Sequence, residues 1–268
     1  MIDGTEKLFA EERQNHILSM LGENGKVLIP ELCTLFSVSA VTIRNDLNEL
    51  ERQGKIKRTH GGAIPLSKTA RELNFQQKQV KNMDVKLALA EYAASLVEDG
   101  DTLVLDTGTT MLALAQKLLT KKNLTIVTND LKIAMLIDEQ STHTVILSGG
   151  VLRRGFYCTT GAMVRDNLHR FRADICFLSS NGMSLRAGFT TPDEGHADMK
   201  REMARICSQT VVICDSSKIG KDYFSVIMPL TEVDRILTDD RIDPADHKAL
   251  LRAEIPLTVV STKEEPNP

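Results

Sequence analysis

The stretch VSAVTIRNDLNELERQGKIKRTHGGAI, residues 38–64, decides how the first part of this chain folds. In it, Ser39 can cap a helix. Three apolar residues follow at the spacing of one helix face: Ile43, Leu47 and Leu50. We therefore predict a helix from Ser39 to about Gln53 with that face buried. The residues after Gly54, KIKRTHGGAI, have the pattern of a β-hairpin, with Gly61-Gly62 at or near its tight bend.

Two shorter helices are predicted ahead of this one. Residues 8–22 carry apolar side chains on one face, and Pro30, a favoured first residue of a helix, follows the apolar run 27–29. We expect the second helix to bury three residues: Leu32, Leu35 and Phe36. Three helices followed by a hairpin form the layout of a winged helix-turn-helix, which we predict for residues 8–66.

The third predicted helix carries a polar face opposite its buried one. Asparagine side chains pair with adenine and arginine side chains with guanine in the DNA major groove, so this face is chemically suited to reading DNA. From Arg52 to His60 there are four Lys or Arg residues and no acidic residue. The predicted DNA-contacting residues are Ser39, Thr42, Arg44, Asn45, Asn48, Arg52, Lys57, Arg58 and His60. The ordered set of helices and basic hairpin disfavours the alternative, a merely solvated helix face.

The bulk composition narrows the class of protein. The formal net charge of the 268-residue chain is −3, so DNA binding would depend on a local basic stripe and not on overall charge. The five cysteines form no Cys-x-x-Cys pair, which favours free thiols in a reducing compartment over zinc ligation. The N-terminus is polar, and no apolar run approaches the ~20 residues of a membrane span. We expect a cytoplasmic protein with no metal and no cofactor.

From residue 84 onward, short apolar runs alternate with amphipathic stretches. The predicted strands are Thr102–Asp106, Leu124–Thr128, Thr144–Ser148, Asp174–Ser180, Thr210–Asp215, Arg235–Thr238 and Leu257–Val260. The predicted helices are 85–98, 109–121, 130–139, 193–208 and 244–252. This alternation predicts an α/β domain with a parallel sheet covered on both faces. We place this domain at residues 84–262, after a polar linker or weakly packed helix at residues 67–83.

The first of these strands leads into a hydroxyl-rich turn, Thr107-Gly108-Thr109-Thr110, ahead of a helix. Backbone N–H groups at that helix N-terminus, together with the hydroxyls, suit a phosphate-sized anion, although a plain capped helix fits equally well. The turn lacks Gly-x-Gly-x-x-Gly and the Gly-Lys-Ser/Thr end of a phosphate loop, which disfavours dinucleotides and nucleoside triphosphates. Polar residues also follow the other strands, and in an open parallel sheet these ends line the edge where ligands bind.

Both parts of the sequence resemble the DeoR-type repressors. Residues 38–64, extended back to Arg13, are similar to the DNA-binding signature of that family. The second part matches the family in DTGTT (106–110), TN (128–129), GG (149–150), NG (181–182), GFTT (188–191) with Glu194, and DSSK (215–218). The resemblance implies a domain similar to sugar-phosphate isomerases that senses a phosphorylated sugar.

The resemblance also implies which residues bind the effector. The turn at residues 106–110 would hold the phosphate, and Asn129, Glu194 and Lys218 would contact the sugar. The full implied set is Asp106, Thr107, Gly108, Thr109, Thr110, Asn129, Gly149, Gly150, Asn181, Glu194 and Lys218. On their own, Asp193 and Glu194 also fit first-turn acids that complement a helix dipole, and Lys218 and Lys221 also fit solvated surface lysines.

Two positions depart from the family pattern. The family more often has two adjacent arginines where this chain has Arg44-Asn45, and because this pair lies on the reading face, the difference bears on the operator sequence and not on the fold. The family commonly has Asp-Gly where this chain has Asn181-Gly182, which bears on the sugar hydroxyl that is recognised.

The leading hypothesis is a repressor of a carbohydrate-utilisation operon. Its affinity for double-stranded operator DNA would change when a phosphorylated sugar or sugar alcohol binds. Palindromic operators require a twofold protein, so we expect a homodimer or homotetramer. The rival hypothesis is an enzyme, a sugar-phosphate isomerase or hydrolase, with Asp106, Glu194 or Lys218 as acid or base. That hypothesis leaves the DNA-reading part without a role, and Asn181 cannot transfer a proton as an aspartate could.

Overall fold

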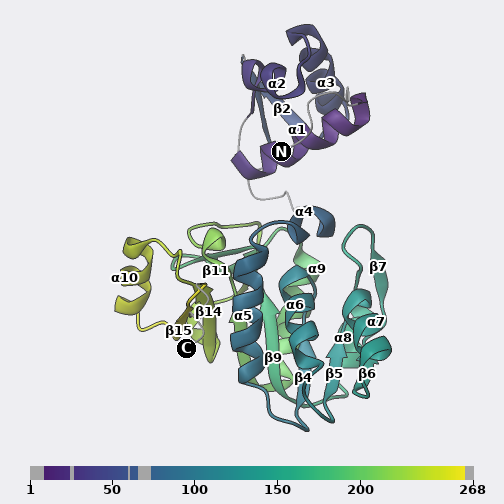
Figure 1. Cartoon of the computed structure of the whole chain (residues 1–268), viewed down its shortest axis with the longest axis vertical. Helices are drawn as coiled ribbons and strands as arrows, with labels where there is room; N and C mark the ends of the chain where they lie inside the picture. Colours follow the sequence, from purple (N-terminus) through teal and green to yellow (C-terminus); the bar gives the residue numbers. More distant parts are fainter. Residues whose placement is uncertain (1–8, 25–26, 60, 66–73, 263–268) are drawn as a thin grey trace, which may run out of the picture. The chain divides into compact units, whose positions relative to one another are not determined.

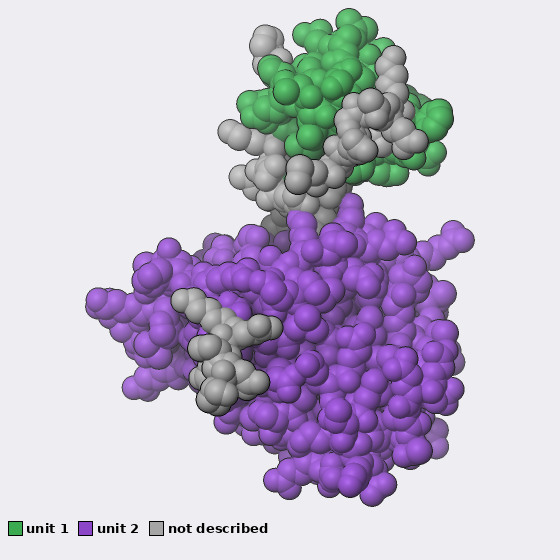
Figure 2. All heavy atoms as spheres, viewed as in Figure 1, with its two compact units in different colours: residues 1–73 green, residues 74–268 purple. Residues whose placement is uncertain are grey.

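The computed structural model of the protein describes residues 9–24, 27–59, 61–65 and 74–262. The chain divides into two compact units, residues 1–73 and residues 74–268, which are coloured separately in Figure 2. No helix among the described residues is long and apolar enough to cross a membrane.

Unit 1 is a winged helix-turn-helix, as predicted. Its helices are α1 (Ala10–Asn24), α2 (Ile29–Phe36) and α3 (Ala40–Arg52), and its strands are β1 (Val27–Leu28), β2 (Ile56–Thr59) and β3 (Gly62–Pro65) (Figure 1). The strands form an antiparallel sheet in the order β1-β3-β2. A Cβ on Gly62 would lie 1.8 Å from the carbonyl oxygen of Val27, so only glycine allows β1 and β3 to pair here.

The predicted buried face of α3 is confirmed. Ile43, Leu47 and Leu50 are fully buried, and the Ser39 hydroxyl caps the helix by accepting a hydrogen bond from the Thr42 N–H at 3.2 Å. These residues pack with Ile17 and Leu21 of α1 among others.

The predicted buried side of α2 is partly wrong. Leu32 is buried and Phe36 is half-buried, but Leu35 is 53% exposed. Since α2 ends at Phe36 and the chain turns away through a left-handed conformation at Ser37, only one side of its last turn meets the core.

Unit 2 contains all seven predicted strands in one parallel sheet. They are β4 (Thr102–Leu105), β5 (Thr125–Thr128), β6 (Thr144–Leu147), β9 (Ala173–Ser179), β12 (Cys207–Ile213), β14 (Arg235–Asp239) and β15 (Leu257–Val260). Their order is β15-β14-β12-β9-β4-β5-β6. Along the chain, β5 and β6 are added on one side of β4. The strands β9, β12, β14 and β15 are then added in turn on the other side of β4. The direction of winding therefore reverses between β4 and β9.

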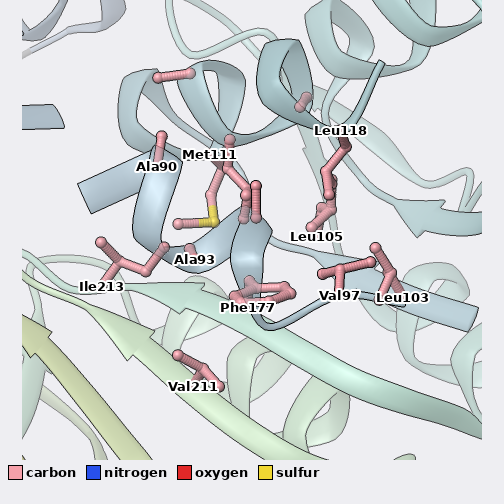
Figure 3. Packing of buried hydrophobic residues seen from close by; sticks show 14 of the residues in the cluster. Ala90, Ala93, Val97, Leu103, Leu105, Met111, Leu118, Phe177, Val211 and Ile213 are labelled. Atoms are coloured by element: carbon pink, nitrogen blue, oxygen red, sulfur yellow. The ribbon is translucent and has the colours of Figure 1, made fainter. Parts of the chain in front are cut away.

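Helices cover both faces of this sheet. α5 (Met83–Ser95), α6 (Thr109–Leu118) and α7 (Leu131–Gln140) pack on one face; α8 (Ala162–Leu168), α9 (Glu194–Arg205) and α10 (Pro244–Arg252) pack on the other. Central strand β9 alternates between the two cores, with Ile175 and Phe177 in one and Cys176 and Leu178 in the other. Figure 3 shows Phe177 in the first core, close to residues of α5 and α6.

Several short elements of unit 2 were not predicted. β7 (Val151–Arg153) and β8 (Cys158–Thr160) form a hairpin, and β10 (Gly182–Ser184), β11 (Gly188–Thr191) and β13 (Ser225–Met228) form a small antiparallel sheet. Helix α8 was also missed. The predicted linker at residues 67–83 includes residues 67–73, which lie outside the described residues, and a five-residue helix, α4 (Phe75–Gln79), whose Phe75 is buried.

Candidate functional site

The predicted reading face of α3 is exposed. Arg44, Asn45, Asn48 and Arg52 are all exposed, whereas Thr42 is half-buried beside the capping Ser39. His60, also predicted to contact DNA, lies outside the described residues. Residues of the helix that point away from the core are therefore those that sequence reasoning assigned to base contacts.

Two predicted DNA-contacting residues hold the wing against α3. The Arg58 guanidinium donates to Asn48 Oδ1, and the Arg58 backbone N–H donates to Glu51 Oε1 at 2.8 Å. Lys57, the preceding residue, is exposed. Arg58 therefore has a structural task that Lys57 does not share.

Arg52 is paired with a carboxylate on its own helix. Its Nη2 lies 2.6 Å from Glu49 Oε1, and hydrogen bonds from Arg52 and Gln53 lower the pKa of Glu49 to about 2. Glu49 is therefore ionised at neutral pH and offsets part of the basic charge at this end of the reading helix.

Below the reading helix, a buried ion pair fixes α3 on α1. Arg13 Nε donates to Asp46 Oδ2 at 2.5 Å and Arg13 Nη2 donates to Asp46 Oδ1 at 3.0 Å. Because two Arg13 nitrogens bond to the two Asp46 oxygens, the pair fixes both the distance between the two side chains and their relative orientation. The reading helix is therefore held by charge as well as by its apolar face.

In unit 2, the point where the winding reverses carries a buried charge cluster. Asp106, directly after β4, is fully buried and accepts hydrogen bonds from the Ser179 N–H at 2.9 Å and the Ser179 hydroxyl at 2.8 Å. The Lys200 ammonium of α9 pairs with the same carboxylate oxygen and donates to the Ser179 carbonyl at 3.0 Å. Ligands of open α/β sheets bind at such a reversal, outside the carboxyl ends of the strands.

The charge state of Asp106 follows from this cluster. Burial acts to raise its pKa, but the Lys200 ammonium and the Ser179 hydrogen bonds outweigh burial, so the pKa of Asp106 lies below its ordinary value. Asp106 is therefore an anion at neutral pH, with its charge already neutralised by Lys200. It acts as a fixed part of the site.

The threonine-rich turn at residues 107–110 lies beside this cluster, at the N-terminus of α6. Gly108 is the N-cap with φ +116°, a conformation that favours glycine, and α6 begins at Thr109. The backbone N–H groups of Thr109, Thr110 and Met111 have no acceptor within the helix, as in any helix N-terminus. They can bind an anion.

A row of buried polar side chains continues from Asp106 across the sheet. Register pairs Leu105 with Thr128 and Thr128 with Leu147, so the next residues of β4, β5 and β6 are neighbours: Asp106, Asn129 and Ser148. Asn129 Nδ2 donates to the Thr159 carbonyl at 2.8 Å. Among the described residues, Asp106 Oδ1, Asn129 Oδ1 and Ser148 Oγ are buried without a hydrogen-bond partner. Buried oxygens of this kind need a donor, which a hydroxylated ligand or water would supply.

The other residues implied to bind an effector lie in the segments that follow strands of unit 2 or at the start of a helix. Asn181, after β9, is half-buried, and its Oδ1 accepts from the Thr191 hydroxyl at 3.0 Å. Glu194 is the exposed first residue of α9, and Lys218, after β12, lies 4.0 Å from Asp215. Gly149 and Gly150 form the turn after β6. Asn181, Lys218 and Gly149-Gly150 thus follow strands of the parallel sheet, whereas Glu194 follows β11 of the small sheet. The strand register makes Asp106 and Asn129 neighbours.

Sequence reasoning missed three residues of this region. Lys200 is 2% exposed, and its signal was available: α9 buries His196, Lys200 and Glu202 on a face shared with Met199 and Met203. Asp130 was not among the predicted site residues, although four donors converge on it. Cys158 lies 3.5 Å from His196 Nε2, and burial raises the pKa of its thiol to about 11, so the thiol stays protonated at neutral pH.

All five cysteines are free, with Cys158, Cys176 and Cys214 buried. In the part of the chain that the structure describes, no group of three or more His, Cys, Asp or Glu residues is arranged to hold a metal ion.

A helix-turn-helix with an exposed reading face, followed by an α/β unit with a polar ligand edge, defines a DNA-binding regulator with a sensor domain. Comparison with known families matches residues 13–69 to the DeoR-like helix-turn-helix domain and residues 81–240 to the DeoR C terminal sensor domain. The chain belongs to the DeoR family of helix-turn-helix transcriptional regulators.

Similar proteins span nearly the whole chain. The HTH-type transcriptional regulator GolR of Listeria innocua is 33% identical over 252 residues, which cover 94% of this chain and 99% of GolR. The uncharacterized regulator YgbI of Escherichia coli is 37% identical over 252 residues, with coverage of 94% and 98%. The regulator GlpR of Haloferax volcanii is 33% identical over 232 residues, with coverage of 87% and 91%. The protein is accordingly a regulator of transcription and not an enzyme.

Solved structures resemble the chain only distantly. Ribose 5-phosphate isomerase A of Methanocaldococcus jannaschii has 17% identity and a TM-score of 0.39, covering 65% of this chain and 66% of the isomerase. The translation initiation factor eIF-2B of Pyrococcus horikoshii has 13% identity and a TM-score of 0.42, with coverage of 85% and 86%. At these scores we draw nothing from the likeness.

Proposed function

We propose that the protein represses a carbohydrate-utilisation operon and that a phosphorylated sugar or sugar alcohol controls its affinity for DNA. The observation that carries this proposal is the set of polar groups at the carboxyl ends of the strands where the winding reverses, next to β4 and β9. There the N-terminus of α6, suited to an anion, lies next to buried oxygens of Asp106 and Asn129 that need hydroxyl donors. A phosphorylated polyol offers both groups in one molecule. One relative, from Escherichia coli O157:H7, is named a putative aga operon transcriptional repressor.

The effector would act by binding two arrangements of the protein unequally. A ligand shifts an equilibrium only by its difference in affinity for the two states, so DNA-bound and DNA-free protein must differ in effector affinity. Because that coupling is reciprocal, operator DNA should change the effector affinity by the same factor as the effector changes the DNA affinity.

The effector proposal is tested by a thermal-shift screen of phosphorylated sugars and sugar alcohols, each paired with its unphosphorylated form. We expect one phosphorylated compound to stabilise the protein, and Thr109→Val to abolish the shift. Thr142→Val, an exposed threonine outside the site, serves as the control. A compound that stabilises the protein equally with and without its phosphate, or whose shift survives Thr109→Val, would place the site elsewhere.

The DNA-reading proposal is tested on duplexes selected from a random library by the purified protein. We expect Arg44→Ala and Asn45→Ala each to weaken binding to the selected sequence by roughly 1–3 kcal/mol and to relax the preference for particular bases. Lys57→Ala should instead weaken binding to all DNA sequences evenly and reduce the salt dependence of binding. Lys57 is a cleaner probe of backbone contact than Arg58, since Arg58 also ties the wing to Asn48. Equal binding by wild type and Lys57→Ala at all salt concentrations would rule out the wing as a phosphate contact.

The same selection tests the oligomeric state. A homodimer or homotetramer should select inverted repeats whose half-sites are about one helical turn, 10–10.5 base pairs, or a multiple apart. Light scattering of the protein in solution should give an even multiple of the 29.7 kDa chain mass. A monomer that selects a single non-repeated site would contradict the twofold arrangement.

A further inference from the structure

The Asp130 carboxylate divides its two oxygens between two different tasks. Oδ1 accepts from the Lys132 N–H at 2.8 Å and the Ile133 N–H at 3.1 Å, which caps α7. Oδ2 accepts from the Thr107 hydroxyl at 2.6 Å and from the Gly108 N–H at 3.1 Å, both in the turn ahead of α6. The side chain is fully buried, so these bonds are shielded from water.

The backbone around Asp130 is itself fixed from several sides. The Asp130 N–H donates to the Thr128 hydroxyl at 3.1 Å, and the Leu131 N–H donates to the Tyr157 carbonyl at 2.8 Å. Asp130 also forms an antiparallel bridge with Cys158 at the start of β8. A helix cap alone requires none of these contacts. They hold the carboxylate at one place relative to β5 and the β7–β8 hairpin.

This arrangement changes the roles of two residues implied to bind the effector. The Thr107 hydroxyl and the Gly108 N–H point to Asp130, so both donors are already used within the protein. The groups left at this turn for an anion are the first-turn N–H groups of α6 and the hydroxyls of Thr109 and Thr110. Their direction depends on how the turn before them is held.

We propose that Asp130 is a positioning residue of the effector site, whose Oδ2 fixes the 107–108 turn so that the N-terminus of α6 faces the anionic group of the ligand. The inference rests on the proposed function, because it takes the α6 N-terminus as the anion site. It goes beyond that function by assigning Thr107 and Gly108 to the tether and Thr109 and Thr110 to the ligand. A turn freed from this tether would sample other conformations, and the anion would have to bind the small fraction that is correctly oriented.

The test separates the two tasks of Asp130 by changing one oxygen. In Asp130→Asn the amide oxygen can still cap α7, since asparagine is as good a cap as aspartate. The amide nitrogen then faces the Gly108 N–H, so that hydrogen bond is lost, whereas the Thr107 hydroxyl can stay bonded only by accepting from the amide. The tether is thereby weakened. Asp243→Asn is the matched control, because Asp243 caps α10 through the Ala245 N–H at 2.8 Å and lies outside the site.

The probe is inorganic phosphate, titrated against the full chain by thermal shift and by phosphorus NMR, with hydrogen exchange of residues 105–112 measured in parallel. Loss of the Gly108 hydrogen bond that orients the turn should weaken phosphate binding by about tenfold in Asp130→Asn. The unfolding temperature without phosphate should fall below that of Asp243→Asn, because the Gly108 N–H loses its acceptor within the protein. Exchange in residues 105–112 should be faster in Asp130→Asn, with or without phosphate.

A double-mutant cycle with Thr107→Val distinguishes a tether from a direct ligand contact. If Thr107 acts only through Asp130, Thr107→Val weakens phosphate binding clearly less in the Asp130→Asn background than in the wild-type background. Additive losses would mean that Thr107 touches the anion, which overturns the assignment. Wild-type or tighter phosphate binding by Asp130→Asn would overturn the positioning role and leave the proposed function standing. Failure of the wild-type protein to bind phosphate, with unchanged exchange in Asp130→Asn, would overturn both.

Discussion

Two buried cations, Arg13 in unit 1 and Lys200 in unit 2, each pair with a carboxylate far away in the sequence. Arg13 joins α1 to Asp46 of α3, and Lys200 joins α9 to Asp106 at the end of β4. Burying an ion pair adds little net stability compared with an apolar pair, but removing one partner leaves the other charge buried and unpaired. Both pairs therefore hold candidate functional elements in a single position: α3, proposed to read DNA, in unit 1 and the proposed ligand-binding sheet edge in unit 2.

Arg13→Ala should destabilise unit 1 strongly although Arg13 lies far from the reading face. We expect a loss of roughly 3–5 kcal/mol in its free energy of unfolding, because Asp46 remains buried without its main partner. Arg52→Ala is the contrasting variant: Arg52 is 76% exposed in its pair with Glu49, and water screens exposed pairs so that losing one changes stability little. Denaturant unfolding followed by circular dichroism measures both. Equal stability losses in the two variants would contradict this account.

Lys86 should give unit 2 a distinctive dependence on pH. Burial lowers the pKa of Lys86 to about 8, against roughly 10.4 in an unfolded chain, and its ammonium donates to the carbonyls of Lys78 and Lys81. Between these two pKa values the unfolded chain holds a proton that the folded protein has released, so stability rises with pH across this window. The neutral amine keeps two hydrogens and can retain both bonds.

The measurement for Lys86 is the free energy of unfolding at pH 7.5 and pH 10 for the wild type, Lys86→Met and the exposed control Lys122→Met. Relative to Lys86→Met, the wild type should gain on the order of 1–2 kcal/mol as the pH rises. The Lys122→Met difference should stay constant. Parallel curves for wild type and Lys86→Met would show that the lysine titrates normally in the folded protein.

At the scale of single residues, the sequence predicted cores and caps better than buried charges. Ser39 and the Ile43, Leu47, Leu50 face follow from local spacing, and the structure confirms them. Lys200 and Asp130 were missed as parts of the site because burial of a charge depends on a partner brought in by the fold, 94 residues away for Lys200. In a sequence, a charged residue on the buried face of a predicted helix indicates that the fold supplies such a partner.

At the scale of elements, the seven parallel strands could be predicted because each contains a short apolar run and amphipathic stretches lie between most of them. The central strands, such as β4 and β9, are largely buried, whereas the edge strands β6 and β15 are partly exposed. The β7–β8 hairpin and the β10, β11 and β13 strands could not, and β8, β10 and β11 consist largely of glycine, serine and threonine, which give no apolar run. Their pairing is set by contacts outside the main sheet, as when β11 of one loop pairs with β13 of another. Local periodicity carries no trace of that pairing.

Helix α4 illustrates an element held by its contacts. Five residues are too few for a stable helix alone, and the Asn74–Gln77 capping box adds only local support. Phe75 is 3% exposed and meets the Tyr157 ring edge-on at 5.4 Å, while the Lys132 ammonium lies 5.0 Å from the Phe75 ring centre. The Phe75 N–H also donates to the Gly155 carbonyl at 3.2 Å. These contacts attach α4 to the β7–β8 hairpin beside the ligand edge.

Phe75→Ala should therefore release α4 from the hairpin. Truncating a buried phenylalanine costs roughly 3–5 kcal/mol, which exceeds what a five-residue helix can lose and stay docked. Limited trypsin digestion should then cut faster after Lys78 and Lys81. Val80→Ala is the control, since Val80 is 81% exposed in the same segment. Unchanged cleavage in Phe75→Ala would mean that other contacts suffice to hold α4.

At the scale of the whole molecule, the two units have separate cores. The buried cluster of unit 1 runs from Ile17 to Ala63, and the two clusters of unit 2 contain residues from Val85 onward. Chains with several cores commonly unfold in more than one step. A perturbation confined to one core should then move one transition only.

Calorimetry of the full chain should show two separable unfolding transitions. If inorganic phosphate binds at the N-terminus of α6 as proposed, it should raise the temperature of the larger transition only, because a ligand stabilises the unit that binds it. Arg13→Ala should lower the smaller transition only, since its ion pair lies within unit 1. A single transition shifted by both changes would mean that the units unfold together. Two independent transitions would instead require that effector and operator be coupled by a change in how the units or subunits are arranged, because neither core would then sense the other's ligand.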